Sequence, residues 1–156
     1  HPYRIILRER VNPYISAFGE HVIGEEVEDA LIKAANEENI RIPEFTVAPN
    51  ISKTGEKSFH EWYIEFEKLP KDLDHFAKKI DTNLRGKNIY YNDLIKGHIL
   101  QPLKIRVIQK NGFINYMKSV GKLGGQNKVP RLSNDTKLAS ALKNWLQKEH
   151  AASLTN

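Results

Sequence analysis

Apolar and polar residues recur with two different spacings along the chain, and each change of spacing marks a change of secondary structure. Residues 3–11 alternate in period two and predict a strand, and residues 14–23 predict a second extended segment that is broken by Gly19. From Glu25 to Glu38 the apolar residues instead recur at helical spacing, with glutamates in the first turn, where the helix dipole favours negative charge. The N-terminal part is therefore predicted to form two strands and a helix.

A β-hairpin is predicted after this helix. Residues 44–48 and 59–67 alternate in period two, and the turn-forming segment Lys53-Thr54-Gly55-Glu56 separates them. The covered face of the second strand would carry His60, Trp62, Ile64 and Phe66. The opposite face would carry Glu61, Glu65 and Glu67, a pattern that a solvated sheet face explains better than a pair of carboxylates for acid–base chemistry.

The C-terminal half alternates helices with one more strand. The predicted elements are a helix over residues 73–84 that Gly86 can terminate, a strand over 103–107 after Pro102, a helix over 113–120 and a last helix over 135–148. Helices mixed with a hairpin and single strands predict an α+β fold. We expect a small mixed or antiparallel sheet that contains the hairpin and is flanked by about four to five helices.

Composition and charge narrow the class of protein. The chain has 156 residues, of which 40% are hydrophobic and 28% charged, which fits one globular domain. Its net charge of +5 would favour phosphates or polyanions, but the 24 basic residues are spread among 19 acidic ones, which argues against nucleic acid as a partner. The absence of cysteine excludes a disulfide framework and a thiolate zinc site. With no signal peptide or bilayer-spanning run, we expect a cytoplasmic protein without a membrane partner.

Most familiar chemical motifs are missing. The six histidines show no metal-ligand spacing, so no metal site is predicted and scattered surface or half-buried imidazoles are expected. Trp62 and Tyr63 could stack nucleobases, but one strand with one exposed aromatic is far from an RNA-binding sheet. Neither a nucleophile elbow nor a dinucleotide-binding fingerprint is present.

One loop stands out, the segment Gly124-Gly125-Gln126-Asn127-Lys128-Val129-Pro130-Arg131. Its glycines permit unusual backbone angles and Pro130 stiffens the far side, so the loop can present Lys128 to a ligand. It is not a phosphate-cradling G-x-x-x-x-G-K-[ST] motif, and a plain surface turn before the last helix is the commoner explanation of such a segment.

The order of several motifs resembles a known family. These motifs are Tyr3-Arg4-Ile5 with Arg10, Ile15-Ser16-Ala17-Phe18-Gly19-Glu20, Asn88 with Tyr91, Gln101 to Ile108, Asn111-Gly112-Phe113, and Gly125 to Arg131. Together they resemble the C-terminal part of the Gretchen Hagen family of acyl-acid amido synthetases, and the hinge stretch is close to the F-I-N-A-F-G-E of bacterial members. The resemblance spans nearly the whole chain.

The resemblance implies a function for the chain as part of a larger enzyme. The family belongs to the adenylate-forming superfamily, in which a large N-terminal domain binds ATP, with Mg, and a carboxylic acid. A small C-terminal domain closes over it, and the activated acid then forms an amide with an amino acid. Residues 1–23 would be the hinge and first strands and residues 24–156 the rest of this C-terminal lid. Because the chain starts at His1 directly in a predicted strand, we expect a fragment that lacks the adenylation domain and is inactive alone.

The resemblance also implies roles for individual residues. Lys128 matches the family's catalytic lysine, whose ammonium would stabilise the charge that builds on the α-phosphate. Arg10 matches the hinge arginine that contacts nucleotide. Gly19, Glu20 and His21 would belong to the hinge that changes conformation as the domain turns. Arg131, beside the loop, suits a structural ion pair as well as a phosphate contact.

The chain departs from the family pattern at several places. Glu9 precedes the hinge arginine where the family commonly has glycine or arginine, His21 stands where plant members have lysine, and Leu94 and Ile95 replace a basic residue. Two other functions therefore stay open from the sequence. One is a basic module that binds phosphate-rich ligands or nucleic acid, and the other is an interaction domain without chemistry that adds its first strand to a partner's sheet.

Overall fold

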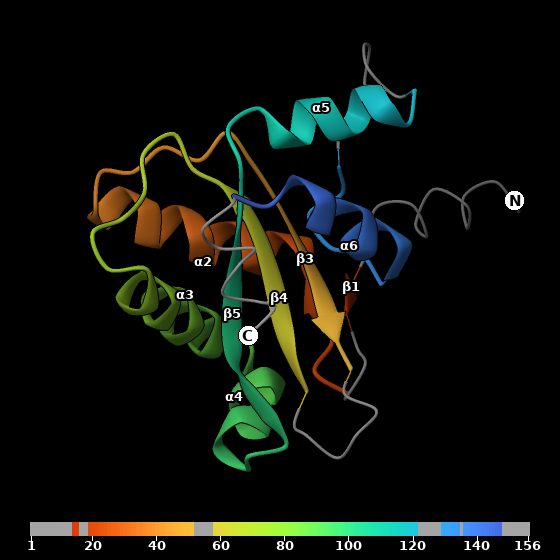
Figure 1. Cartoon of the computed structure of the whole chain (residues 1–156). Helices are drawn as coiled ribbons and strands as arrows, with labels where there is room; N and C mark the ends of the chain where they lie inside the picture. Colours follow the sequence, from red (N-terminus) through yellow and green to blue (C-terminus); the bar gives the residue numbers. More distant parts are fainter. Residues whose placement is uncertain (1–13, 16–18, 52–57, 122–128, 135, 148–156) are drawn as a thin grey trace, which may run out of the picture.

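A mixed three-stranded sheet organises the chain. The computed structural model describes residues 14–15, 19–51, 58–121, 129–134 and 136–147. The elements are β1 (Tyr14–Ile15), β2 (Val22–Ile23), α2 (Gly24–Glu37), β3 (Glu44–Asn50), β4 (Ser58–Glu65), α3 (Leu73–Lys87), α4 (Ile89–Lys96), β5 (Leu100–Ile108), α5 (Gly112–Ser119), α6 (Thr136–Leu142) and the 3₁₀ turn η1 (Lys143–Trp145). These helices and the small mixed sheet confirm the predicted α+β fold (Figure 1).

The sheet has the order β3-β4-β5, with the hairpin strand β4 in the centre. The strands β3 and β4 pair antiparallel, with Val47 opposite Trp62, which confirms the predicted hairpin. The chain then crosses over through α3 and α4, and β5 pairs parallel to β4, with Trp62 opposite Ile105. The short strands β1 and β2 form a separate antiparallel ladder in the segment that contains Gly19.

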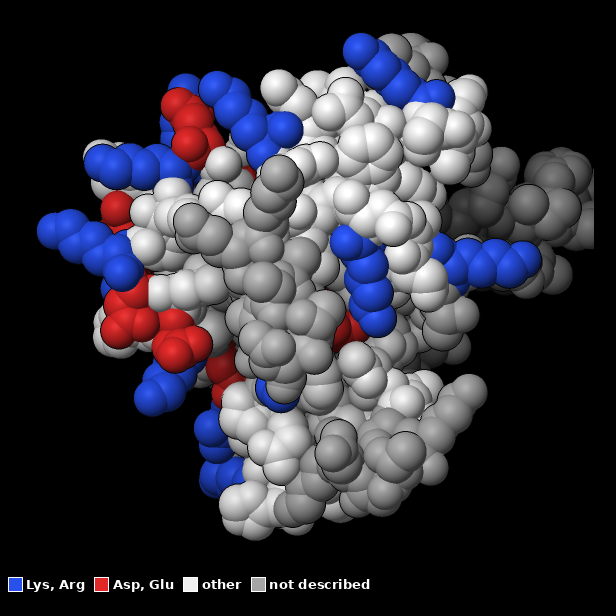
Figure 2. All heavy atoms as spheres, viewed as in Figure 1, with Lys and Arg blue, Asp and Glu red and all other residues white. Residues whose placement is uncertain are grey.

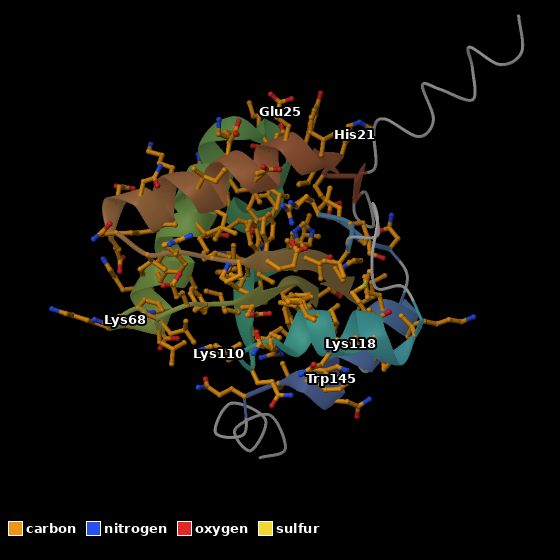
Figure 3. All side chains as sticks on the ribbon, turned by 90° about the horizontal axis from the view of Figure 1, so that it is seen from above. His21, Glu25, Lys68, Lys110, Lys118 and Trp145 are labelled. Atoms are coloured by element: carbon orange, nitrogen blue, oxygen red, sulfur yellow. The ribbon has the colours of Figure 1, made fainter. Side chains whose placement is uncertain are left out.

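Helices cover both faces of the sheet, which gives three layers when the molecule is viewed from above (Figure 3). The helices α2, α3 and α4 pack on one face, in a core that includes Val27, Leu31, Phe76, Ile80, Trp62, Ile64, Ile105 and Val107. On the other face lie α5 and α6, in a smaller core of Tyr63, Ile108, Phe113, Met117, Val129, Leu142 and Leu146. The central strand is thus buried on both sides.

The two long helices follow their sequence signals. In α2 the buried residues are the predicted apolar stripe, and the carboxylate of Glu26 accepts a hydrogen bond of 3.0 Å from the amide of Ile23 at the N-terminus. In α3 the side chain of Asp72 caps the N-terminus through the amide of His75. Gly86 does not end α3, because the helix continues to Lys87 and ends at Asn88.

One helix was not predicted, and two element boundaries differ from the predictions. The helix α4 was not predicted, since only two of its residues, Tyr91 and Ile95, are buried and too few apolar positions recur to show a period. Pro102 lies inside β5 rather than before it, at a register shift opposite residues 59–61, where an edge strand tolerates a residue without an amide hydrogen. The last helix is shorter than residues 135–148, because α6 gives way to η1 at Lys143.

The polar face predicted for residues 59–67 is solvated only at Glu67, which lies beyond the end of β4. Glu61 and Glu65 are 3% and 6% exposed, and Tyr63 between them is fully buried, so the expectation of an exposed aromatic on this strand is also wrong. The reason is that α5 and α6 cover this face. Each carboxylate has partners: Glu61 binds Arg106 at 2.7 Å and accepts from the Tyr63 hydroxyl at 3.0 Å, and burial raises the pKa of Tyr63.

Glu65 ties the central strand to α5. Its carboxylate accepts hydrogen bonds from the amides of Asn111, at 3.0 Å, and Phe113, at 3.3 Å. Asn111 is the N-cap residue of α5, with a left-handed φ of 64° and no capping bond of its own. The side chain of a distant strand therefore satisfies amides that the helix start leaves unpaired.

A buried hydrogen bond joins α3 to α4. The hydroxyl of Tyr91 donates to the Asp81 carboxylate at 2.5 Å, and Tyr91 is fully buried. Burial raises the pKa of Asp81 above its usual range, an effect that the hydrogen bond and the nearby Arg85 only partly offset. Burial also raises the pKa of Tyr91, which therefore stays the donor.

Within the described residues, no helix combines the length and the apolar character needed to cross a bilayer.

Replacing Glu65 should weaken the contact between the sheet and α5. Glu65→Ala removes the acceptor of the Asn111 amide and leaves the buried amide of Phe113 unpaired, so we expect the free energy of unfolding to fall by about 1–3 kcal/mol. Glu65→Gln keeps one acceptor and should cost less. Urea denaturation of the three proteins measures both values, and an unchanged midpoint for the alanine variant would contradict the capping role.

Asp81→Asn should change how stability depends on pH. Because the pKa of Asp81 is raised in the folded state, this carboxyl's contribution to stability is complete below its unfolded pKa and declines as pH rises through the folded pKa. The stability of Asp81→Asn relative to the natural chain should therefore increase between about pH 4 and pH 7. Denaturation midpoints across this range test the trend, with Tyr91→Phe as a comparison that keeps the carboxyl. A constant difference would refute it.

Candidate functional site

The predicted hinge residues enter the domain through a buried hydrogen-bonded pair of side chains. One carboxylate oxygen of Glu20 lies 2.7 Å from Nε2 of His60 on the central strand β4, and both side chains are completely buried. Glu20 comes from the segment between β1 and β2, 40 residues away in the sequence. Since a buried carboxylate without a partner is strongly disfavoured, this contact holds the segment against the face of the sheet that α2 and α3 cover.

Asn88 binds His21, the residue that follows Glu20. Its amide group donates to the backbone carbonyl of His21 at 3.2 Å and to the carboxylate of Glu26 at 3.1 Å. Its side-chain oxygen accepts from the amide of Tyr91 at 2.9 Å and so caps α4. The buried side chain of Asn88 thus joins the hinge segment, residues 19–21, to the start of α2 and to the junction of α3 and α4.

Tyr91 lies beside both the Glu20–His60 pair and Asn88. The ring of His60 lies 5.4 Å from the ring of Tyr91, centre to centre, and the hydroxyl of Tyr91 binds Asp81. We call the set Glu20, His60, Asn88, Tyr91 and Asp81 the hinge cluster. Through His21 and His60, it links the family-like stretch of Asn88 and Tyr91 to the family-like stretch that ends at Glu20.

Backbone angles in the hinge segment are unusual. Gly19 has a φ of +89°, and His21 has a φ of +46°, which non-glycine residues rarely adopt. A Cβ atom at Gly19 would meet nothing within 4 Å, so the conformation rather than crowding requires glycine there. His21 is exposed beside the N-terminus of α2, near Glu25 (Figure 3).

The structure brings together one part of the predicted site. Gly19, Glu20 and His21 lie together at the hinge cluster, while Arg10 and Lys128 lie outside the described residues. His60 contradicts the expectation of scattered surface or half-buried histidines. The one sequence signal for its burial was its place on the face of Trp62, Ile64 and Phe66, and nothing in the pattern identified Glu20 as its partner.

Arg131 forms structural ion pairs. Its guanidinium contacts the carboxylate of Glu44, lies 3.6 Å from that of Glu28, and stacks 4.6 Å above the ring centre of Phe45. It borders a hollow of about 210 Å³ between α2 and β3, which is smaller than the usual size of a small-molecule site. With two carboxylates beside it, Arg131 does not provide the positive surroundings that a phosphate group needs.

The part of the chain that the structure describes contains no group of three or more side chains with the chemistry and proximity to hold a metal ion. The residues expected to meet ATP, Arg10 and Lys128, lie outside this part.

Comparison with solved structures shows where this architecture recurs. A "GH3.15 acyl acid amido synthetase" superposes with a TM-score of 0.68 at 15% sequence identity, over 86% of this chain and 25% of that one. A second structure, "AtGH3.15 acyl acid amido synthetase in complex with 2,4-DB", gives a TM-score of 0.67 at 15% identity, over 86% and 26%. The chain thus shares their fold and spans about a quarter of their length.

Comparison at the level of sequence agrees with the motif order. No curated protein sequence matches the chain. The family model described as "GH3 family C-terminal domain" matches residues 25–137, which is well over half of the 156 residues and includes Lys128. The chain therefore belongs to the GH3, or Gretchen Hagen, family, as a C-terminal domain.

Proposed function

We propose that this chain is the mobile C-terminal domain of an ATP-dependent acyl-acid amido synthetase. The complete enzyme would convert a carboxylic acid into an acyl-adenylate and then form an amide with an amino acid. The observation that carries the proposal is the family match over residues 25–137, which begins directly after the hinge segment and its buried anchor. The fold shared with two acyl acid amido synthetases, over about a quarter of their length, supports it.

Lys128 would act in the adenylation step. Attack of the acid's carboxylate on the α-phosphate spreads negative charge over the phosphate oxygens, and an ammonium group placed beside them stabilises that charge in the transition state. Arg10 would contact the ribose or phosphate oxygens, for which the fixed fork of a guanidinium is suited. The N-terminal adenylation domain would supply the acid pocket and most of the contacts to ATP and Mg.

The distribution of charge gives less support to a nucleic-acid module. Several cations are paired with carboxylates, among them Lys79 with Glu38 at 3.1 Å, Lys87 with Asp29 at 3.6 Å and Arg106 with Glu61. Figure 2 shows lysines and arginines interspersed with carboxylates on the side where α2 and α3 lie. Mixed signs dilute the positive potential that phosphate backbones require.

Lys128→Ala should impair adenylation. In the chain joined to its N-terminal domain, we expect the rate of pyrophosphate release to fall about 100- to 1,000-fold, the usual loss when one preorganised donor to transition-state charge is removed. Lys118→Ala is the matched control, since Lys118 is exposed on α5 (Figure 3). Equal rates for Lys128→Ala and the control would remove Lys128 from the mechanism.

The chain alone should be inactive. Because the acid pocket and most nucleotide contacts are expected in the N-terminal domain, the 156-residue chain should release no pyrophosphate with ATP, Mg and a panel of carboxylic acids. Adding the separately produced N-terminal domain, or joining it to the chain, should restore release. Activity of the chain by itself would contradict the assignment as a partial enzyme.

A further inference from the structure

The short helix α4 carries apolar side chains that the domain itself leaves exposed. Ile89 and Tyr90 in its first turn are 66% and 62% exposed, and Ile99, just beyond its end, is 58% exposed. We propose that these three residues, the α4 patch, form a surface on which the domain docks against the N-terminal domain of the same enzyme in one of its orientations. This rests on the proposed function, which requires that partner.

The three side chains lie on one side of the helix. Tyr90 and Gly97 are seven residues apart, which is about two helical turns, so they share a face. A Cβ atom at Gly97 would lie 3.8 Å from the terminal methyl carbon of Ile99, so Ile99 continues this face beyond the helix end. Ile89 borders Tyr90 in the first turn. The patch is therefore one surface at the end of the sheet where β5 begins (Figure 1).

The patch cannot turn inward, because the opposite side of α4 is fixed. Tyr91 and Ile95 are buried in the core, and the hydroxyl of Tyr91 binds Asp81. Beyond the helix, the amide of Ile99 donates to the carbonyl of Leu94 at 3.0 Å. Grouped apolar side chains that are held in this way stay in water unless another surface covers them, and such groups mark interaction sites.

The other exposed large apolar side chains among the described residues do not gather on one short element. They are Ile32 on α2, Ile51 after β3, Leu69 after β4, and Ile114 and Val120, which come from the start and the end of α5. Scattered residues of this kind are normal on protein surfaces and need no partner.

Contacts at the start of α4 bring the patch next to the hinge segment. Asn88, the N-cap residue of α4, directly precedes Ile89, and its amide group donates to the carbonyl of His21 at 3.2 Å. Under the proposed function, the chain enters this domain from the N-terminal domain through that segment. Two bodies joined by a hinge approach each other most closely beside it, so the patch lies where the N-terminal domain comes into reach.

The size of the patch favours a partner that is attached to the chain over a second copy. Stable interfaces between separate proteins bury about 800 Å² on each side, and three partly exposed side chains supply only a fraction of that area. A tethered domain is present at an effective concentration in the millimolar range, so a small apolar surface is sufficient and can be released again. Both properties suit a domain that changes its orientation.

Thiol labelling tests the docking directly. Because the chain contains no cysteine, Tyr90→Cys and Ile99→Cys each introduce a single reactive position into it. We expect N-ethylmaleimide to label these thiols at least fivefold more slowly in the protein joined to its N-terminal domain than in the 156-residue chain, in the presence or the absence of ATP. A surface that is covered for about four fifths of the time reacts at about one fifth of the rate.

Ile32→Cys is the matched control, since Ile32 is 47% exposed on α2 and lies outside the patch. It should be labelled at the same rate in both proteins, and mass spectrometry of the labelled peptides separates each thiol from any in the N-terminal domain. Equal rates for Tyr90→Cys in both proteins, with and without ATP, would overturn the docking. So would the same slowing at Ile32→Cys, or slow labelling of the 156-residue chain that depends on its concentration, which would mark a second copy as the partner.

A kinetic measurement in the joined protein tests what the docking does. Tyr90→Ser combined with Ile99→Ser should slow amide formation at least fivefold, while the urea midpoint of the 156-residue chain stays unchanged because both side chains are exposed. An unchanged rate of amide formation would contradict the proposal. If the natural joined protein releases no pyrophosphate with any acid, the proposed function fails, while the labelling rates still decide whether the patch is covered.

Discussion

The covering of both faces of a three-stranded sheet is the constraint on which this structure depends. Because helices lie on either side, every residue of the central strand β4 from His60 to Glu65 is buried, including the imidazole of His60 and the carboxylates of Glu61 and Glu65. Water cannot solvate these groups, so each requires a partner from within the protein. The partners come from distant parts of the chain and fix how those parts dock.

Three buried polar side chains of β4 each contact a different element of the domain. Glu61 binds Arg106 across the pairing with β5, Glu65 caps the start of α5, and His60 holds Glu20 of the hinge segment. Such contacts contribute less to net stability than apolar packing does. Removing one partner leaves the other buried and unpaired, which costs free energy, so the contacts favour one particular arrangement of the elements. The polar residues thereby specify positions, while the two apolar cores supply the driving force.

This arrangement suits a domain that turns as a rigid unit. Under the proposed function, a lid would place a loop lysine accurately only if the loop, the sheet and the hinge anchor kept their relative positions during the turn. The parallel bridge between Val47 and Leu132 and the ion pairs of Arg131 attach the residues that follow the Lys128 loop to β3. The hinge anchor on β4 and this loop attachment on β3 lie on adjacent strands of one sheet.

The sequence by itself determined the elements with a strong period and the family. The stripes of α2 and α3 and the alternation of the hairpin were readable because burial on one side imposes a repeat of 3.6 or 2, and the motif order pointed to the family without reference to any contact. Only the tertiary structure decided which faces were covered and which polar groups met. Glu61 and Glu65 looked like surface residues because an alternating strand predicts one solvated face, and α5 and α6, placed later in the chain, removed the water from it. The pairing of Glu20 with His60 spans 40 residues, and periodicity, which reports local burial alone, carries no signal for a contact at that separation.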